Sequence, residues 1–191
     1  MMSIGSVKSA GSAGNYYTDK DNYYVIGSMD ERWQGKGAEA LGIDGKAVDK
    51  ALFTELLKGK LPDGSDLTRI QDGVNKHRPG YDLTFSAPKS VSMLAMLGGD
   101  KRLIDAHNRA VTVALNQVES LASTRVKKDG VSETVLTGNL IIARFNHDTS
   151  RAQDPQIHTH SVVINATQNG DKWQTLASDT VGKTGFSETI L

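Results

Sequence analysis

The sequence predicts one α+β domain built on an antiparallel sheet. The chain has 191 residues, 38% of them hydrophobic, which is enough for one ordinary core. The predicted strands and helices do not alternate regularly, as they would in a parallel α/β sheet. Two apolar segments, 139–147 and 156–166, are joined by the polar loop 148–155, which predicts an antiparallel hairpin.

The other elements follow from local patterns. Apolar residues at helical spacing predict helices over 47–57, 89–97 and 101–122, and Asp100 is placed to cap the last of these. Alternating polar and apolar residues over 81–87 predict a strand with one apolar face. Further elements depend on glycine. Four glycines in 33–45 predict a loop broken by a short helix, and Asp129-Gly130 predicts a hairpin tip after Lys127-Lys128. A further secondary-structure element is expected to begin within 185–191, at the end of the sequence, which suggests that the chain is a fragment of a longer protein.

The composition argues against several classes of function. Because 22 Lys and Arg balance 22 Asp and Glu, bulk electrostatics alone would not hold nucleic acid, and any such binding requires a local site. No apolar run approaches the roughly 20 residues of a membrane helix, and the first residues lack the apolar core of a secretory signal. The absence of Cys excludes disulfides and thiolate chemistry, and it fits a reducing compartment.

Three of the five histidines fall on the predicted hairpin. His158 and His160 are two residues apart on a strand, so both rings leave the same face. His147 ends the partner strand, where a hairpin brings it opposite that pair. Three imidazoles on one face predict a metal site with open positions, suited to Lewis-acid work on a phosphoryl or carbonyl oxygen. The alternative is that all three are ordinary surface residues.

Four of the five tyrosines, Tyr16, Tyr17, Tyr23 and Tyr24, lie close together near the N-terminus. A tyrosine hydroxyl can attack an electrophile and form a covalent intermediate when a metal or base assists its ionisation. The same cluster is also compatible with a buried aromatic plug or a platform on which bases stack.

Asp82 faces away from the apolar side of its predicted strand. It can be solvent-facing, it can fix the ring of a ligand histidine, or it can accept the proton of an attacking tyrosine. The residues by themselves favour the solvent-facing position. Two other histidines are assigned no function. His107 is expected to be packed or half-exposed beside the apolar stripe of a helix, and His77 to lie on a solvated basic turn.

One further motif is rejected. Gly182-Lys183-Thr184 resembles the end of a phosphate-binding loop, but the required glycine at position 177 is Ala177. We therefore expect no nucleotide binding by this element.

Several segments together resemble the relaxase domain of TraI/TrwC-type conjugative relaxases of F-like plasmids. They are Ser12–Tyr17, Tyr23-Tyr24, Trp33–Ala38, Gly80–Ser92, His147 and His158–His160. The similarity extends over the whole chain. It implies a palm-like HUH endonuclease fold, with a five-stranded antiparallel sheet flanked by helices and the tyrosines N-terminal to the histidines.

The resemblance also implies an activity. Such domains nick one DNA strand at the nic site of a plasmid transfer origin (oriT) and stay attached to the new 5′ end through a phosphotyrosine. Tyr16 would be the first nucleophile, Tyr17 auxiliary, and Tyr23 or Tyr24 a candidate for a second transfer. Asp82 would orient a ligand or help deprotonate Tyr16. Arg151 matches a DNA-contacting position.

The expected cofactor is one divalent ion on His147, His158 and His160. The resemblance suggests Mg²⁺, and ligand softness suggests Mn²⁺ or Zn²⁺. The expected partners are single-stranded oriT DNA, relaxosome proteins and the transfer machinery, in a bacterial cytoplasm and without membrane insertion. Residues 1–191 would form one relaxase domain lacking the C-terminal segment that closes over the DNA. Two alternatives remain: a hydrolytic metal-dependent nuclease, and a non-catalytic origin-binding fragment.

Overall fold

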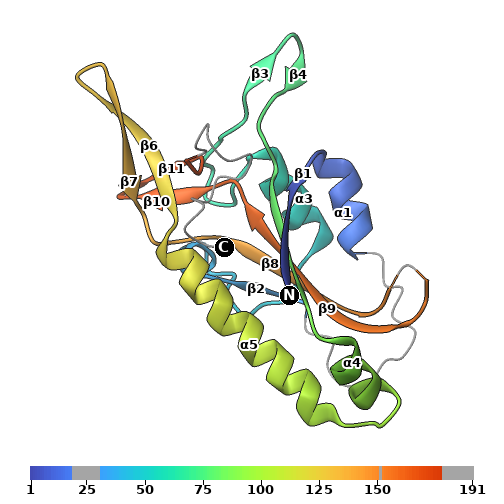
Figure 1. Cartoon of the computed structure of the whole chain (residues 1–191). Coiled ribbons are helices and arrows are strands. Elements are labelled where there is room, and N and C mark those ends of the chain that lie inside the picture. Colours follow the sequence, from blue (N-terminus) through green and yellow to red (C-terminus); the bar gives the residue numbers. More distant parts are fainter. Residues whose placement is uncertain (19–30, 151, 178–191) are drawn as a thin grey trace.

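The fold is α+β and is built on a five-stranded antiparallel sheet, as predicted (Figure 1). The computed structural model describes residues 1–18, 31–150 and 152–177. In order across the sheet, the strands are β1 (Met2–Val7), β5 (Gly80–Ser86), β9 (Pro155–Ile164), β8 (Ile142–Thr149) and β2 (Arg32–Gln34). The two longest strands, β8 and β9, therefore lie inside the sheet and have a partner on each side.

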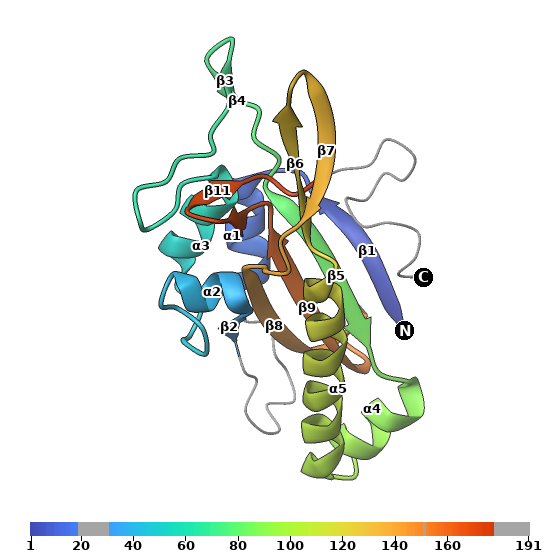
Figure 2. The ribbon, with the colours of Figure 1, turned by 90° about the vertical axis from the view of Figure 1, so that its left-hand side faces the viewer.

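Helices cover both faces of this sheet (Figure 2). On one face lie α1 (Ala10–Thr18) and α3 (Lys50–Lys58), which pack against each other. On the other face lie α4 (Lys89–Met96) and the long α5 (Lys101–Ser120). The short helix α2 (Lys36–Ala40) follows β2 at the sheet edge.

Alternation along β8 and β9 creates two cores. Phe145 points toward α1 and α3, where it packs with Tyr17 and Phe53. Ile142 and Val163 point the other way and pack with apolar residues of α5. Because successive side chains of a strand leave opposite faces, even-numbered residues of β9 lie on the α1 side and odd-numbered residues on the α5 side.

Three two-stranded hairpins complete the described structure. They are β3 (Ile70–Gln71) with β4 (Val74–Asn75), β6 (Ser123–Lys128) with β7 (Val131–Leu136), and β10 (Thr167–Asn169) with β11 (Lys172–Gln174). The predicted tip at Asp129-Gly130 is confirmed: both residues have positive φ, 51° and 82°, as tight hairpin turns require. The β3–β4 and β6–β7 hairpins project from the same end of the molecule (Figures 1 and 2).

The predicted helices are confirmed with shifted ends. The helix expected over 47–57 begins at Lys50, because the Asp49 side chain caps it by accepting from the backbone N–H of Leu52 at 2.8 Å. It ends at Gly59, whose φ of 93° provides a left-handed C-cap. Asp100 caps α5 as predicted.

The predicted hairpin of 139–147 and 156–166 is confirmed as β8 and β9, which extend closer to the loop than expected. The register shifts between His147 and Thr149, at the end of β8. The short helix expected within 33–45 is α2. The element expected at 185–191 lies outside the described residues.

Candidate active site

Three histidine rings face one another near the loop that joins β8 to β9. His147 and His158 are direct partners in the register, and His160 is two residues further along β9. The ring centroids lie 5.3 Å apart for His147 and His158, 5.2 Å for His147 and His160, and 5.1 Å for His158 and His160. The antiparallel pairing and the strand alternation therefore bring together the three histidines that the sequence analysis singled out.

Hydrogen bonds orient two of these rings. The Nδ1 atom of His158 lies 3.0 Å from the carbonyl oxygen of Gln156, so it carries the proton and donates. The Nδ1 atom of His160 lies 2.7 Å from Oδ2 of Asp82 and 3.2 Å from Oγ1 of Thr84. Both residues thus use Nδ1 for orientation, which leaves Nε2 for a ligand.

The protonation of the rings suits metal binding. Burial, followed by the proximity of His160 and His158, lowers the pKa of His147 to about 4. Burial also lowers the pKa of His158. A ring that stays neutral at physiological pH offers a free nitrogen lone pair, which is the form that ligates a metal ion.

The donor set fits a divalent ion in residue type, and the lowered pKa values of His147 and His158 favour the neutral rings that an ion requires. Within residues 1–18, 31–150 and 152–177, no group of three or more His, Asp or Glu side chains has its donor atoms already arranged around one ion. A bound ion would therefore require local adjustment of these side chains, whose ring centroids already lie 5.1–5.3 Å apart.

Asp82 is held inside the site, so the expectation of a solvent-facing carboxylate is wrong. Its side chain is 14% exposed. One oxygen, Oδ2, accepts both from Nδ1 of His160 at 2.7 Å and from the hydroxyl of Tyr17 at 2.9 Å. Asp82 is enclosed because β5 pairs with β9. This pairing places the side chains of Asp82 and His160 next to each other on the sheet face that α1 covers.

Helix α1 delivers two tyrosines to the histidines, in contrasting environments. Tyr16 is 53% exposed, and its ring centroid lies 6.1 Å from that of His160. Tyr17 is 8% exposed and stacks on Phe145 at 5.7 Å. Burial and then the negative charge of Asp82 raise the pKa of Tyr17 far above its usual value. Tyr17 is therefore held neutral as a hydrogen-bond donor, whereas Tyr16 is accessible to a substrate.

Other predicted site residues have different outcomes. Tyr23, Tyr24 and Arg151 lie outside the described residues. His107 is half-buried on α5 as expected. His77 is 9% exposed, so its assignment to a solvated turn is wrong: it packs beneath Gly59, where an added Cβ would lie 3.0 Å from its ring. Thr84, which contacts both Asp82 and His160, was missed, although its spacing of two from Asp82 placed it on the same face.

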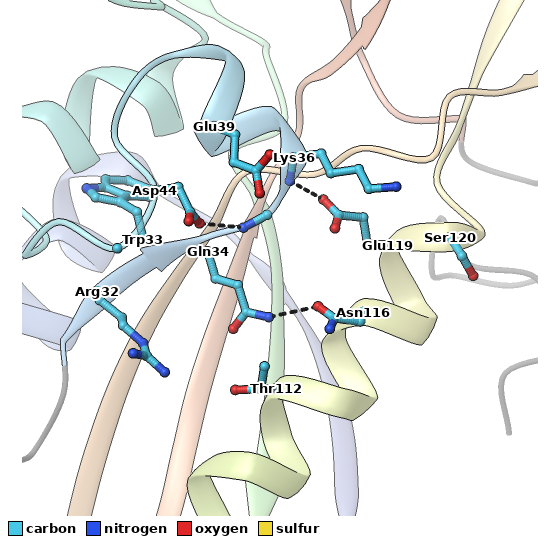
Figure 3. A pocket seen from close by; sticks show the side chains of 12 residues that line it. Arg32, Trp33, Gln34, Lys36, Glu39, Asp44, Thr112, Asn116, Glu119 and Ser120 are labelled. Atoms are coloured by element: carbon cyan, nitrogen blue, oxygen red, sulfur yellow. Dashed lines mark hydrogen bonds between the residues drawn. The ribbon is translucent and has the colours of Figure 1, made fainter.

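A separate polar hollow of about 510 Å³ lies between β2, α2 and α5 (Figure 3). Gln34 donates to the side chain of Asn116 across it at 3.2 Å. One oxygen of Glu119 accepts from the backbone N–H groups of Lys36 at 2.7 Å and Leu140 at 2.9 Å. Glu119 thus ties the start of α2 and the approach to β8 to the end of α5.

This combination of fold and site defines the class of HUH relaxases: an antiparallel sheet with a His-x-His pair, a third histidine on the next strand, and tyrosines on a covering helix. The chain belongs to the TrwC relaxase family, whose profile matches residues 10–186. It is 74% identical over its whole length to the multifunctional conjugation protein TraI of Escherichia coli, and 73% identical to that of strain K12. The chain spans 11% of the length of each of these curated relatives.

Solved structures of the conjugative relaxase TrwC share the fold. The metal-bound complex with oriT DNA is 43% identical with a TM-score of 0.82, and the alignment covers 95% of this chain and 63% of that one. A complex with a 27-mer DNA that comprises the recognition hairpin and the cleavage site is 41% identical with a TM-score of 0.79, over 92% and 60%. A copper-bound complex aligns with a TM-score of 0.83 at 43% identity, over 95% and 63%. Among the described helices of the present chain, none is long and apolar enough to cross a membrane.

Proposed function

We propose that this chain nicks single-stranded DNA at a plasmid transfer origin by tyrosine transesterification, and so initiates conjugative transfer. Similarity in sequence and in structure supports transfer-origin DNA as the substrate. The curated relatives are conjugation proteins, and the related TrwC structures hold oriT DNA. The observation that carries the proposal is the placement of exposed Tyr16 beside the His160 ring, on the face where the three histidines meet.

Tyr16 is the nucleophile of the proposed reaction. Its Oη attacks the scissile phosphorus in line, forming a bond to phosphorus while the bond to the 3′ oxygen breaks. The tyrosine proton leaves to solvent, to which the exposed Tyr16 has access, and the departing 3′ oxygen takes up a proton. The products are a 5′-phosphotyrosine and a free 3′ hydroxyl. Because one phosphodiester replaces another, the free end can attack in turn and restore the strand.

His147, His158 and His160 would hold a divalent ion. Such an ion would supply Lewis-acid stabilisation of the negative charge on the scissile phosphate. Mg²⁺ is the proposed physiological ion, and Mn²⁺ or Zn²⁺ would also suit three imidazoles. The TrwC structures include a copper-bound complex, which supports a site that accepts several ions.

Asp82 and Tyr17 support these groups in the proposed reaction. Asp82 fixes the ring of His160 through Nδ1 and keeps its Nε2 directed toward the ion. Tyr17 donates to the same carboxylate oxygen and is an auxiliary residue. Outside the described residues, Tyr23 or Tyr24 would serve a second transfer and Arg151 would contact the DNA. Relaxosome proteins and the transfer machinery are the proposed further partners, in the cytoplasm of a plasmid-bearing bacterium.

The test is adduct formation on a single-stranded oligonucleotide that carries a candidate nic site, with Mg²⁺ or Mn²⁺ present. A denaturing gel resolves the covalent protein–DNA adduct. We expect it with the wild type, and we expect its loss in Tyr16→Phe and in His158→Ala. Tyr17→Phe is the matched control, because it removes the neighbouring hydroxyl and should still form the adduct.

Each other outcome has a distinct meaning. Cleavage without an adduct, unaffected by Tyr16→Phe, would overturn the transesterification and favour a hydrolytic nuclease. Binding of the oligonucleotide without cleavage, in all variants and with either ion, would favour a fragment that only binds origin DNA.

A further inference from the structure

The sheet face behind the three histidines is polar, whereas the far end of the same face is apolar. Farther along β8 and β9, Ile142 and Val163 pack against the apolar side of α5. Behind the histidines the corresponding positions are Asn146 and Thr159, which are 5% and 0% exposed. Asn146 directly precedes His147, and Thr159 lies between His158 and His160. The intervening pair on this face, Arg144 and Ser161, is also polar and buried, so the polar part of the face runs from that pair to the residues that flank the candidate ligands.

These two side chains connect the strands to each other and to α5. Thr159 Oγ1 donates to Oδ1 of Asn146 at 2.6 Å, across the register pair that the two residues form. Nε2 of His107 on α5 lies 2.9 Å from the same Oγ1. Nδ2 of Asn146 donates to Oδ1 of Asn108, also on α5, at 3.0 Å. The four residues form one continuous chain, named here the α5 clamp: His107, Thr159, Asn146 and Asn108.

The hydrogen bonds of the clamp fix the direction of its protons. Asn146 gives its amide N–H to Asn108, so the oxygen of Asn146 faces Thr159 and can only accept. The single hydroxyl proton of Thr159 is thereby used, and Thr159 Oγ1 must accept from His107. His107 is accordingly the tautomer protonated on Nε2. Burial, followed by Arg144 and His158, lowers its pKa to about 4, so this ring stays neutral.

A buried polar chain of this kind is a costly way to join a helix to a sheet. Apolar side chains would fill the same space without desolvating polar groups, as they do at Ile142 and Val163. A satisfied polar chain instead specifies one arrangement of its members, because each hydrogen bond has a required direction and length. Because the clamp residues on β8 and β9 are the direct neighbours of the three histidines, the arrangement that the clamp specifies includes the positions of those histidines.

We propose that the α5 clamp consists of positioning residues: His107, Thr159, Asn146 and Asn108. They hold β8 and β9 in the backbone geometry that directs the three imidazoles toward one ion. Because successive side chains on a strand are coupled through the backbone, fixing Thr159 behind the sheet fixes the directions of His158 and His160 in front of it. The register shift that begins at His147 increases the need for an anchor at Asn146. This inference rests on the proposed metal site.

The experiment measures Mn²⁺ affinity by isothermal titration calorimetry, well below the melting temperature. Thr159→Val and His107→Phe each break the clamp while preserving shape. We expect each to weaken Mn²⁺ binding by about 10–100-fold, the usual effect of removing groups that orient ligands. Thr159→Ser and His107→Gln retain a hydroxyl and an N–H donor respectively, so they should bind close to wild type. If Thr159→Val does not fold, the Mn²⁺ affinity of His107→Phe, whose substitution lies on α5 and outside the sheet, tests the inference alone.

Thr124→Val is the matched control. Thr124 is 1% exposed on β6 and donates to the carbonyl of Thr175 at 2.8 Å, away from the histidines. It should lower the melting temperature as Thr159→Val does and leave Mn²⁺ affinity unchanged. Wild-type affinity in both clamp variants would overturn the inference, as would an equal loss in Thr124→Val. His158→Ala distinguishes failure of this inference from failure of the proposed metal site. If His158→Ala binds Mn²⁺ as the wild type does, the proposed metal site itself is wrong.

Discussion

The hydroxyl of Tyr17 donates to Oδ2 of Asp82 at 2.9 Å, and the same oxygen accepts from His160 at 2.7 Å. Adjacent residues of α1 therefore have different environments: Tyr17 is fixed in the protein interior by a carboxylate, and Tyr16 is exposed beside it. A tyrosine that already donates to a carboxylate is a poor nucleophile, because its ionised form would be repelled by that charge. The contrast supports a division of roles between the two tyrosines.

The first prediction concerns alkaline pH and Tyr17→Phe. Burial and Asp82 raise the pKa of folded Tyr17, so above about pH 10 the unfolded chain releases a proton that the folded chain keeps. The stabilising effect of Tyr17 is complete below that pH and decreases as pH rises. Urea unfolding should show Tyr17→Phe less stable at pH 7, by about 1–3 kcal/mol, with the difference from wild type shrinking toward pH 11. Tyr16→Phe is the control, and a constant difference would contradict the prediction.

The second prediction concerns mild acid and His107. Its pKa is lowered from 6.5 to about 4, so between these values the unfolded chain binds a proton that the folded chain does not. Stability should therefore decrease as pH falls through this window, with a slope from this residue below about 1.4 kcal/mol per pH unit because partial exposure screens it. His107→Gln should show a shallower decrease in metal-free urea unfolding. An identical slope in the two proteins would contradict this.

The third prediction concerns Asp82→Asn. Both hydrogen bonds end on one oxygen of Asp82, which an amide oxygen could replace, but the amide carries no negative charge and therefore holds His160 and Tyr17 less strongly. We expect Mn²⁺ affinity to fall by about 10–100-fold in calorimetry. Tyr16→Phe, which leaves these hydrogen bonds intact, should bind Mn²⁺ as the wild type does. If Asp82→Asn keeps wild-type affinity, Asp82 does not orient a ligand.

The fourth prediction concerns Glu119, which is 6% exposed beside the polar hollow of Figure 3. Glu119→Ala leaves the backbone N–H groups of Lys36 and Leu140 without their acceptor, so it should destabilise the fold by about 2–4 kcal/mol in urea unfolding. Glu119→Gln keeps an acceptor oxygen and should cost less. Glu39→Ala removes an exposed carboxylate from the same hollow and serves as the control. Equal stability of Glu119→Ala and Glu39→Ala would show that Glu119 does not stabilise the fold through these two backbone N–H groups.

Elements with strong local patterns could be predicted from the sequence. The periodicity and caps of α3 and α5, and the paired apolar runs of β8 and β9, were sufficient to place them. Strands β1 and β2 were missed. β1 (MSIGSV) has little local pattern and is defined by its pairing with β5, and β2 is three residues long and is defined by pairing with β8. Such short edge strands depend on tertiary partners more than on propensity.

The site was predictable as far as strand geometry determines it. The spacing of two between His158 and His160 and the hairpin position of His147 depend only on pleat and pairing. The environment of Asp82 depended on which strand would lie beside β5, and local sequence does not specify that neighbour. His77 was misplaced for the same reason, because its burial comes from packing beneath distant Gly59. The clamp behind the histidines also needed the tertiary contact of α5 with β8 and β9.

The central claim is that Tyr16 attacks the scissile phosphate, and peptide mapping of the covalent adduct tests it most directly. After nuclease trimming, trypsin releases the peptide between Lys8 and Lys20, which contains both Tyr16 and Tyr17. Fragmentation by tandem mass spectrometry then locates the residual nucleotide. We predict that it is attached to Tyr16. Attachment to Tyr17, or to a peptide that contains Tyr23 and Tyr24, would contradict the account.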